Sequence, residues 1–119
     1  MKIKIKVDDI SVKAKLYDNK MAKEIWDVLP LEGVVKTWGD EIYFPIPIKT
    51  GYSNKKAVVD VGELGFWEAG KAFCIFFGPT PGSDKPKPAN PVDVFGKIIE
   101  NPKIFKKIPS GAKIKVERI

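Results

Sequence analysis

The stretch from residue 71 to residue 82 reads Lys71-Ala72-Phe73-Cys74-Ile75-Phe76-Phe77-Gly78-Pro79-Thr80-Pro81-Gly82. Residues 72–77 are all apolar and do not alternate with polar side chains, which is typical of a β-strand buried on both faces. The glycines and prolines that follow end this strand. Cys74 has apolar neighbours and the chain contains no histidine to act as its base, so we expect it to be a core residue and not a nucleophile.

Alternating segments on both sides of this stretch predict half-buried strands. Residues 2–7 and 10–17 alternate apolar with polar side chains around a turn at Asp8-Asp9, which predicts an antiparallel hairpin with a solvated, lysine-rich face. Further strands are expected over the segments 34–38, 41–47, 57–61, 92–99 and 112–119. The glycines of segment 62–67 indicate a turn or a bulge at that point.

Helical signals are few. Asn19 is a helix cap and Pro30 ends the apolar spacing that follows it, so one α-helix is expected between them. A short helical turn is expected from Pro102 to Lys107. About eight short strands with one helix and one helical turn predict a mainly β fold, a small barrel or sandwich, in a single domain over residues 1–119.

Composition excludes several classes of protein. The 119 residues are 44% hydrophobic, so intrinsic disorder is excluded, and no apolar run reaches the length of about 20 residues that a membrane span needs. Met1 leads directly into an alternating strand, so we expect no signal peptide, and the single cysteine fits a reducing cytoplasm.

The charge of the chain comes almost entirely from lysine. Lys plus Arg is 21 against 15 acidic residues, giving a net charge of +6, and Arg118 is the only arginine. Because arginine supplies the bidentate contacts to bases and phosphates, we expect no specific nucleic-acid partner. The lysine and glutamate content, without glutamine, resembles that of thermophilic proteins.

The absence of histidine removes the commonest metal ligand and the usual general base. Acidic pairs occur at Asp8-Asp9 and Asp40-Glu41, but adjacent acids on a strand point to opposite faces, and Asp8-Asp9 and Gly39-Asp40 have the residue types of turns. Glycine-rich phosphate loops are also absent. We therefore expect no metal, no cofactor and no residue with an assigned catalytic role.

Three segments carry a family resemblance: residues 37–44 (TWGDEIYF), 61–70 (VGELGFWEAG) and 71–81 (KAFCIFFGPTP). Together with the hairpin and the single helix, they resemble the small stand-alone cyclophilin-like family of prokaryotes. The chain departs from that family's pattern at Glu63, where aspartate is common, and at Glu68-Ala69, where prolines are usual. The resemblance implies a closed eight-stranded barrel with a helix at one end, similar to domains of 5-oxoprolinase and allophanate-hydrolase-type subunits.

The resemblance also raises prolyl isomerisation as an activity. True cyclophilins stabilise the twisted prolyl amide with an arginine in a Phe-His-Arg context. This chain has no histidine and its one arginine is the penultimate residue, so the cationic group that this catalysis needs is missing. We expect a binding module for a small molecule or a peptide. A residual isomerase, a subunit-like part of an amide or lactam hydrolase, and an interaction module acting through loop 79–91 are the alternatives, and a homodimer is left open.

The expected binding site lies between segments 38–44, 62–67 and 76–81. Its candidate residues have aromatic or polar side chains suited to an apolar pocket with a few hydrogen-bonding groups: Trp38, Tyr43, Glu63, Trp67, Phe76 and Thr80. Glu63 and Trp67 stand four residues apart and would share a strand face unless a bulge at Gly65 intervenes. The alternative is that the aromatic residues are core and that Glu63 is a solvated turn residue.

Overall fold

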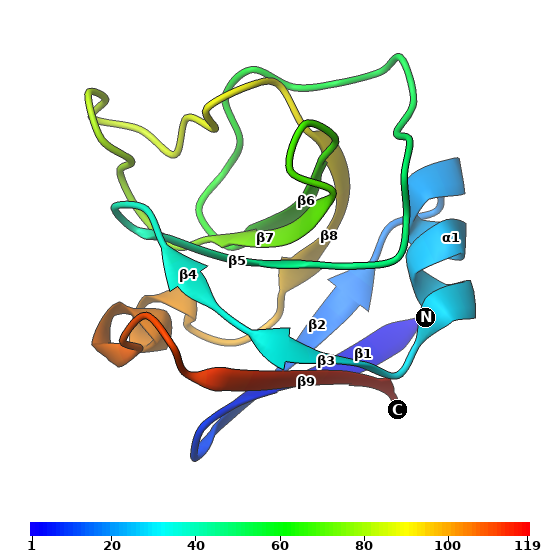
Figure 1. The fold of residues 1–119 in the computed structure, drawn as a ribbon, viewed down its shortest axis with the longest axis horizontal. Helices are drawn as coiled ribbons and strands as arrows, with labels where there is room; N and C mark the ends of the chain where they lie inside the picture. The colour runs from blue at the N-terminus through cyan, green and yellow to red at the C-terminus, as the bar shows by residue number, and fades with distance from the viewer.

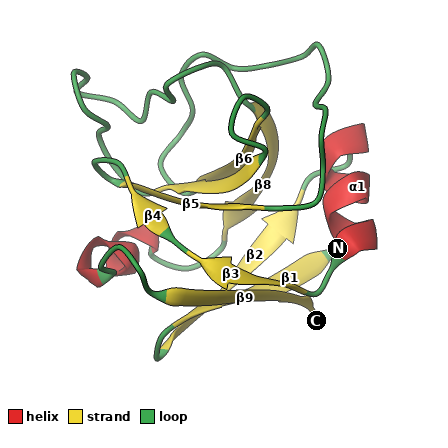
Figure 2. Cartoon of the chain, in the orientation of Figure 1, coloured by secondary structure: helices red, strands yellow, loops and turns green.

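The computed structural model describes all 119 residues as a nearly closed β-barrel with one α-helix and one 3-10 helix (Figures 1 and 2). The strands are β1 (Lys2–Val7), β2 (Ile10–Leu16), β3 (Leu31–Val34), β4 (Lys36–Thr37), β5 (Glu41–Pro45), β6 (Glu63–Trp67), β7 (Ala72–Phe76), β8 (Asp93–Ile98) and β9 (Lys113–Arg118). The helices are α1 (Lys20–Val28) and η1 (Pro102–Lys107). None of these helices is long and apolar enough to cross a bilayer.

All neighbouring strands pair antiparallel, in the order β3-β9-β1-β2-β8-β6-β7-β5-β4. The two outermost strands, β3 and β4, are consecutive in the chain and are separated only by Val35. The Val35 N–H donates to the Ala112 carbonyl at 2.9 Å, so the chain stays beside β9 through this corner. Counted as one bent strand, residues 31–37 bring the number of strands to eight, as expected, although β6 was not among the strands predicted from the sequence.

Strand β7 lies between two apolar layers. Phe73 and Ile75 point into the barrel, where the Phe73 ring packs against the rings of Phe44 and Phe95 at centroid distances of 5.3 and 5.0 Å. The alternate residues of β7 point outward into a second apolar group, which we call the outer cluster: Val59, Ala72, Cys74, Phe76 and Val92. The prediction of a strand buried on both faces is confirmed.

Helix α1 covers one end of the barrel (Figure 1). Asn19 caps it, because its side-chain oxygen accepts a hydrogen bond from the Ala22 N–H at 2.9 Å. The helix buries Met21, Ala22 and Ile25 against the inner core of the barrel. The helix and the helical turn expected from the sequence are both confirmed.

The predicted strand over residues 57–61 is wrong. This segment has no ladder partner; a single bridge joins Lys56 to Val92, and the Val59 N–H donates to the Pro86 carbonyl at 3.0 Å. Val59 is buried in the outer cluster while Val58 and Val61 are exposed, so the apolar run covers the outside of the barrel as a loop. The long loops before β6 and after β7 gather over the same side of the barrel (Figure 2).

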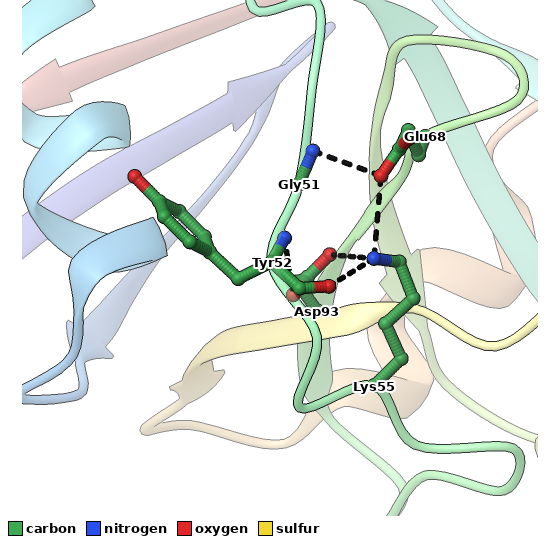
Figure 3. Close-up of polar contacts among 5 residues, drawn as sticks. All are labelled: Gly51, Tyr52, Lys55, Glu68 and Asp93. Carbon is green, nitrogen blue, oxygen red and sulfur yellow. Dashed lines mark hydrogen bonds and ion pairs between the residues drawn. The ribbon is translucent and has the colours of Figure 1, made fainter.

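Loop 46–62 is attached to this side by an ionic network (Figure 3). The Lys55 ammonium lies 3.3 Å from a carboxylate oxygen of buried Asp93 and 3.2 Å from Glu68. The Gly51 N–H donates to Glu68 at 3.0 Å, and the Tyr52 N–H donates to Asp93 at 3.0 Å. A Cβ on Gly51 would stand 2.1 Å from an Asp93 oxygen, so only glycine fits this close approach.

Candidate functional site

The outer face of β5 and β6 carries a small cavity of about 180 Å³, which we call the aromatic hollow. Its lining residues are Trp38, Glu41, Tyr43, Trp67, Pro88, Ala89 and Val92. Glu41 and Tyr43 alternate with Ile42 and Phe44, which point into the barrel, so strand geometry places the first two on the outer face. The proline-rich segment after β7 supplies the opposite wall.

Aromatic packing fixes the Trp67 indole at the edge of the hollow. Its ring stands at 88° to that of Tyr43, with 5.8 Å between the centroids. The indole N–H donates to the Asn90 side-chain oxygen at 2.9 Å. Gly70 lies against the ring so closely that a Cβ there would be 2.4 Å from it. The indole is therefore held in one orientation, which is the arrangement a binding wall needs.

Glu41 is the buried acid of the hollow, with only 5% of its surface exposed. The Cys74 thiol on β7 neighbours its carboxylate but donates to the Ala72 carbonyl at 3.8 Å, and no cationic side chain of the protein pairs with the carboxylate. Burial raises the pKa of the Glu41 carboxyl to about 7. Burial, with the neighbouring Glu41, also raises the pKa of Cys74 well above its usual range. The neighbouring acid Asp40 instead pairs with the Lys106 ammonium at 3.4 Å.

Glu63 lies in a different cavity, a polar pocket of about 500 Å³ between the start of α1 and loop 46–62. Its carboxylate accepts hydrogen bonds from the Tyr17 hydroxyl at 2.8 Å, the Asp60 N–H at 2.8 Å and the Lys56 ammonium at 3.1 Å. Burial alone would raise the pKa of Glu63, but these donors together lower it. Burial and the contact with Glu63 raise the pKa of Tyr17.

Glu63 and Trp67 both lie on the outer side of β6 but do not meet. The register with β8 shifts between Leu64 and Gly65, as the glycine spacing suggested, and the extra residue is on β8. A Cβ on Gly65 would stand 2.7 Å from a methyl group of Val92. The Val92 side chain therefore occupies the space above Gly65, between the aromatic hollow and the polar pocket.

Phe76 and Thr80 support the hollow without lining it. Phe76 is fully buried in the outer cluster, against which Tyr43 and Trp67 pack. The Thr80 hydroxyl accepts from the Lys87 N–H at 3.0 Å and donates to the Lys87 carbonyl, which closes the turn leading into Pro88. Of the six candidate residues, the structure thus brings Trp38, Tyr43 and Trp67 together.

The sequence analysis missed Glu41 because it considered this residue only as a pair with Asp40, and two adjacent acids on a strand point to opposite faces. The available signal was the spacing of two between Glu41 and Tyr43 within a strand, which places both on one face. Tyr43 was already a candidate residue, and the residue two positions before it on the strand is Glu41.

Comparison with known proteins places these features in a family. A sequence profile of the cyclophilin-like proteins matches residues 1–117. The chain belongs to the cyclophilin-like family. Among solved structures, this cyclophilin-like chain is similar to the hypothetical protein AF2241 from Archaeoglobus fulgidus, with 34% identity, a TM-score of 0.83, and coverage of 100% of this chain and 95% of that one.

A second solved structure, McbB in complex with tryptophan, shares the fold with a TM-score of 0.74 and 16% identity. The match covers 98% of this chain but only 44% of McbB, so this chain spans less than half of that protein. Among curated proteins, none matches the chain significantly.

Proposed function

We propose that this cyclophilin-like protein is a binding module that accepts part of a small molecule or of a peptide in the aromatic hollow. One observation carries the proposal: three amphipathic aromatic side chains converge on a cavity whose only acid is buried and lacks a cationic partner. Buried acids without partners are costly, so a site that keeps one is a candidate for function.

The size of the hollow limits what it can hold. A cavity of about 150 Å³ accommodates a molecule the size of benzene, whereas pockets for drug-sized ligands start at about 300 Å³. At about 180 Å³, the hollow fits a headgroup or one side chain of a larger ligand. McbB, which shares the fold, has been solved with tryptophan bound, and this supports a small-molecule role for such a barrel.

Three tryptophans provide a test with an internal control. Trp38 and Trp67 line the hollow, whereas Trp26 lies on α1. The Arg118 guanidinium carbon stands 4.9 Å from the centroid of the Trp26 ring. In a screen of small fragments by two-dimensional NMR, we expect binders to shift the indole N–H signals of Trp38 and Trp67 and to leave Trp26 unchanged. A screen in which binders shift only signals outside the hollow would contradict the proposal.

Prolyl isomerisation has no cationic group to support it. Arg118 donates from Nη2 and Nε to the Trp26 carbonyl at 2.7 and 3.1 Å, so its guanidinium is engaged at the end of α1. No lysine lines the hollow. We expect the protein not to accelerate cis–trans exchange of an X-Pro peptide in a coupled protease assay. The control is an authentic cyclophilin at equal concentration; a comparable rate from this protein would favour the isomerase alternative.

The remaining alternatives have less support. A hydrolase that used Cys74 would need an accessible thiolate, but this thiol is fully buried and its pKa is raised. An interaction module acting through loop 79–91 would need the prolines of that loop to be accessible, but Pro86 and Pro88 are buried. The loop is also held by a hydrogen bond within it, from the Lys87 N–H to the Thr80 hydroxyl. The loop thus acts in our proposal as a wall of the hollow.

A further inference from the structure

The charge at the aromatic hollow is opposite to the charge of the protein. The chain carries +6 with 20 lysines among its 21 basic residues, yet no basic side chain lines this cavity. Glu41 is its only acid, and no ammonium or guanidinium of the protein pairs with it. A bound cation would supply the missing partner, whereas an anion would be repelled.

The walls of the hollow fit the outside of an alkylated cation. Trp38, Tyr43 and Trp67 provide three aromatic side chains, and the rings of the last two stand nearly perpendicular. Aromatic rings attract cations electrostatically, most strongly for tryptophan, and cages of such rings recognise quaternary ammonium groups. N-alkyl groups also bury apolar surface against the rings, which a hydrated metal ion cannot do.

We infer that the hollow takes the alkylammonium group of its ligand, with Glu41 as counter-ion and the three aromatic side chains around the alkyl substituents. This inference rests on the proposed function, because it names the ligand chemistry of the same site. The cavity of about 180 Å³ is large enough for a trimethylammonium head and too small for the rest of a larger ligand. The same group occurs on free choline-like molecules and on methylated lysine side chains.

The first test compares choline with 3,3-dimethylbutan-1-ol, which has the same shape without the charge. Titrations followed by the Trp38 and Trp67 indole signals should give choline at least about tenfold tighter binding. Glu41→Gln should reduce this preference to the part that the aromatic rings supply, and Asp40→Asn, the same change in the adjacent acid, should leave it unchanged. Glu41 makes no salt bridge within the protein, so we expect Glu41→Gln to fold. The two-dimensional NMR spectrum of the variant verifies this before the titration.

The outcomes separate the two claims. If the neutral alcohol binds as tightly as choline and shifts the same two indoles, the hollow is a binding site but the ammonium inference is wrong. If neither compound shifts these indoles at tens of millimolar, the inference is overturned. If other fragments then also fail to shift them, the proposed function is overturned as well. A trimethyllysine peptide tested beside choline distinguishes the two sources, and tighter binding of either one supports the inference.

Discussion

Glu41→Gln is expected to stabilise the protein at pH 8 by roughly 2–3 kcal/mol in urea unfolding. Burial raises the pKa of this carboxyl from 4.5 to about 7, so the folded state binds its proton more tightly than the unfolded state does. The stabilisation from the protonated acid is complete below pH 4.5 and is lost as the pH rises through 7. Glutamine carries no charge and avoids this loss, apart from the smaller cost of burying an amide.

The control is to compare the stability of wild type and Glu41→Gln at a second, acidic pH. At pH 4.5 and below, the wild-type acid is protonated in the folded state, so the two proteins should differ little in their free energy of unfolding. A stability gain in the variant that is equal at both pH values would point to packing and not to charge. A destabilised variant at pH 8 would contradict the absence of a partner for Glu41, and with it the reason for regarding this acid as functional.

Glu63→Gln is expected to have the opposite effect, a loss of roughly 2–3 kcal/mol at pH 8. The Glu63 carboxylate accepts from Tyr17, Lys56 and the Asp60 N–H, and hydrogen bonds to a buried charged group contribute about 1.5–3 kcal/mol each. The glutamine side chain has only one oxygen acceptor, and its NH₂ group would face hydrogen-bond donors that it cannot accept from. Urea unfolding of both glutamine variants in one buffer measures the contrast directly.

The pH dependence of Glu63 also has the opposite sign. Its donors lower its pKa in the folded state, so its stabilisation is present above the ordinary glutamate pKa and is lost as the pH falls through the folded value. The difference between wild type and Glu63→Gln should therefore shrink in acid. A Glu63→Gln protein as stable as wild type at pH 8 would show that Glu63 is a solvated residue and that the polar pocket does not depend on it.

Much of the fold followed from the sequence because hydrophobic periodicity and local caps decide it. The uniform apolar run of β7 indicated burial on two faces, and Asn19 and Pro102 marked the starts of the two helices. Segment 57–61 was predicted wrongly because Val59 is buried by the outer cluster and not by a ladder. Apolar residues that cover the outside of a barrel have the same composition as a strand, and pairing partners cannot be read from composition.

The site was predictable only in part. Trp38, Tyr43 and Trp67 were identified from their residue types, and the fold brings them to one hollow. Glu63 was chosen over Glu41 because glycines flank it, yet Val92 fills the space above Gly65. The donors around Glu63 come from Tyr17, which follows β2, and from loop 46–62. Contacts between distant segments decide which acid remains without a partner, and no local pattern records them.

The titratable groups around Glu41 are few, so its ionisation can report on ligand binding. Tyr43 on the same strand and Cys74 on β7 are titratable neighbours of Glu41. The adjacent Asp40 is paired with the Lys106 ammonium, and the other residues that line the hollow carry no charge. A cation that pairs with the ionised carboxylate must lower the pKa of that carboxyl, by thermodynamic linkage. The effect is specific to Glu41, because Glu63 is already ionised and paired in the polar pocket.

The most direct measurement is therefore a carbon-13 NMR pH titration of the Glu41 carboxyl carbon, with and without saturating choline. We expect a midpoint near pH 7 in the free protein, since burial raises the pKa of this group to about 7. Choline should lower this midpoint, while the titration of the Glu63 signal should not change. A midpoint in the ordinary glutamate range in the free protein, or a midpoint near 7 that choline leaves unmoved, would contradict the assignment of this hollow as a site for a cationic ligand.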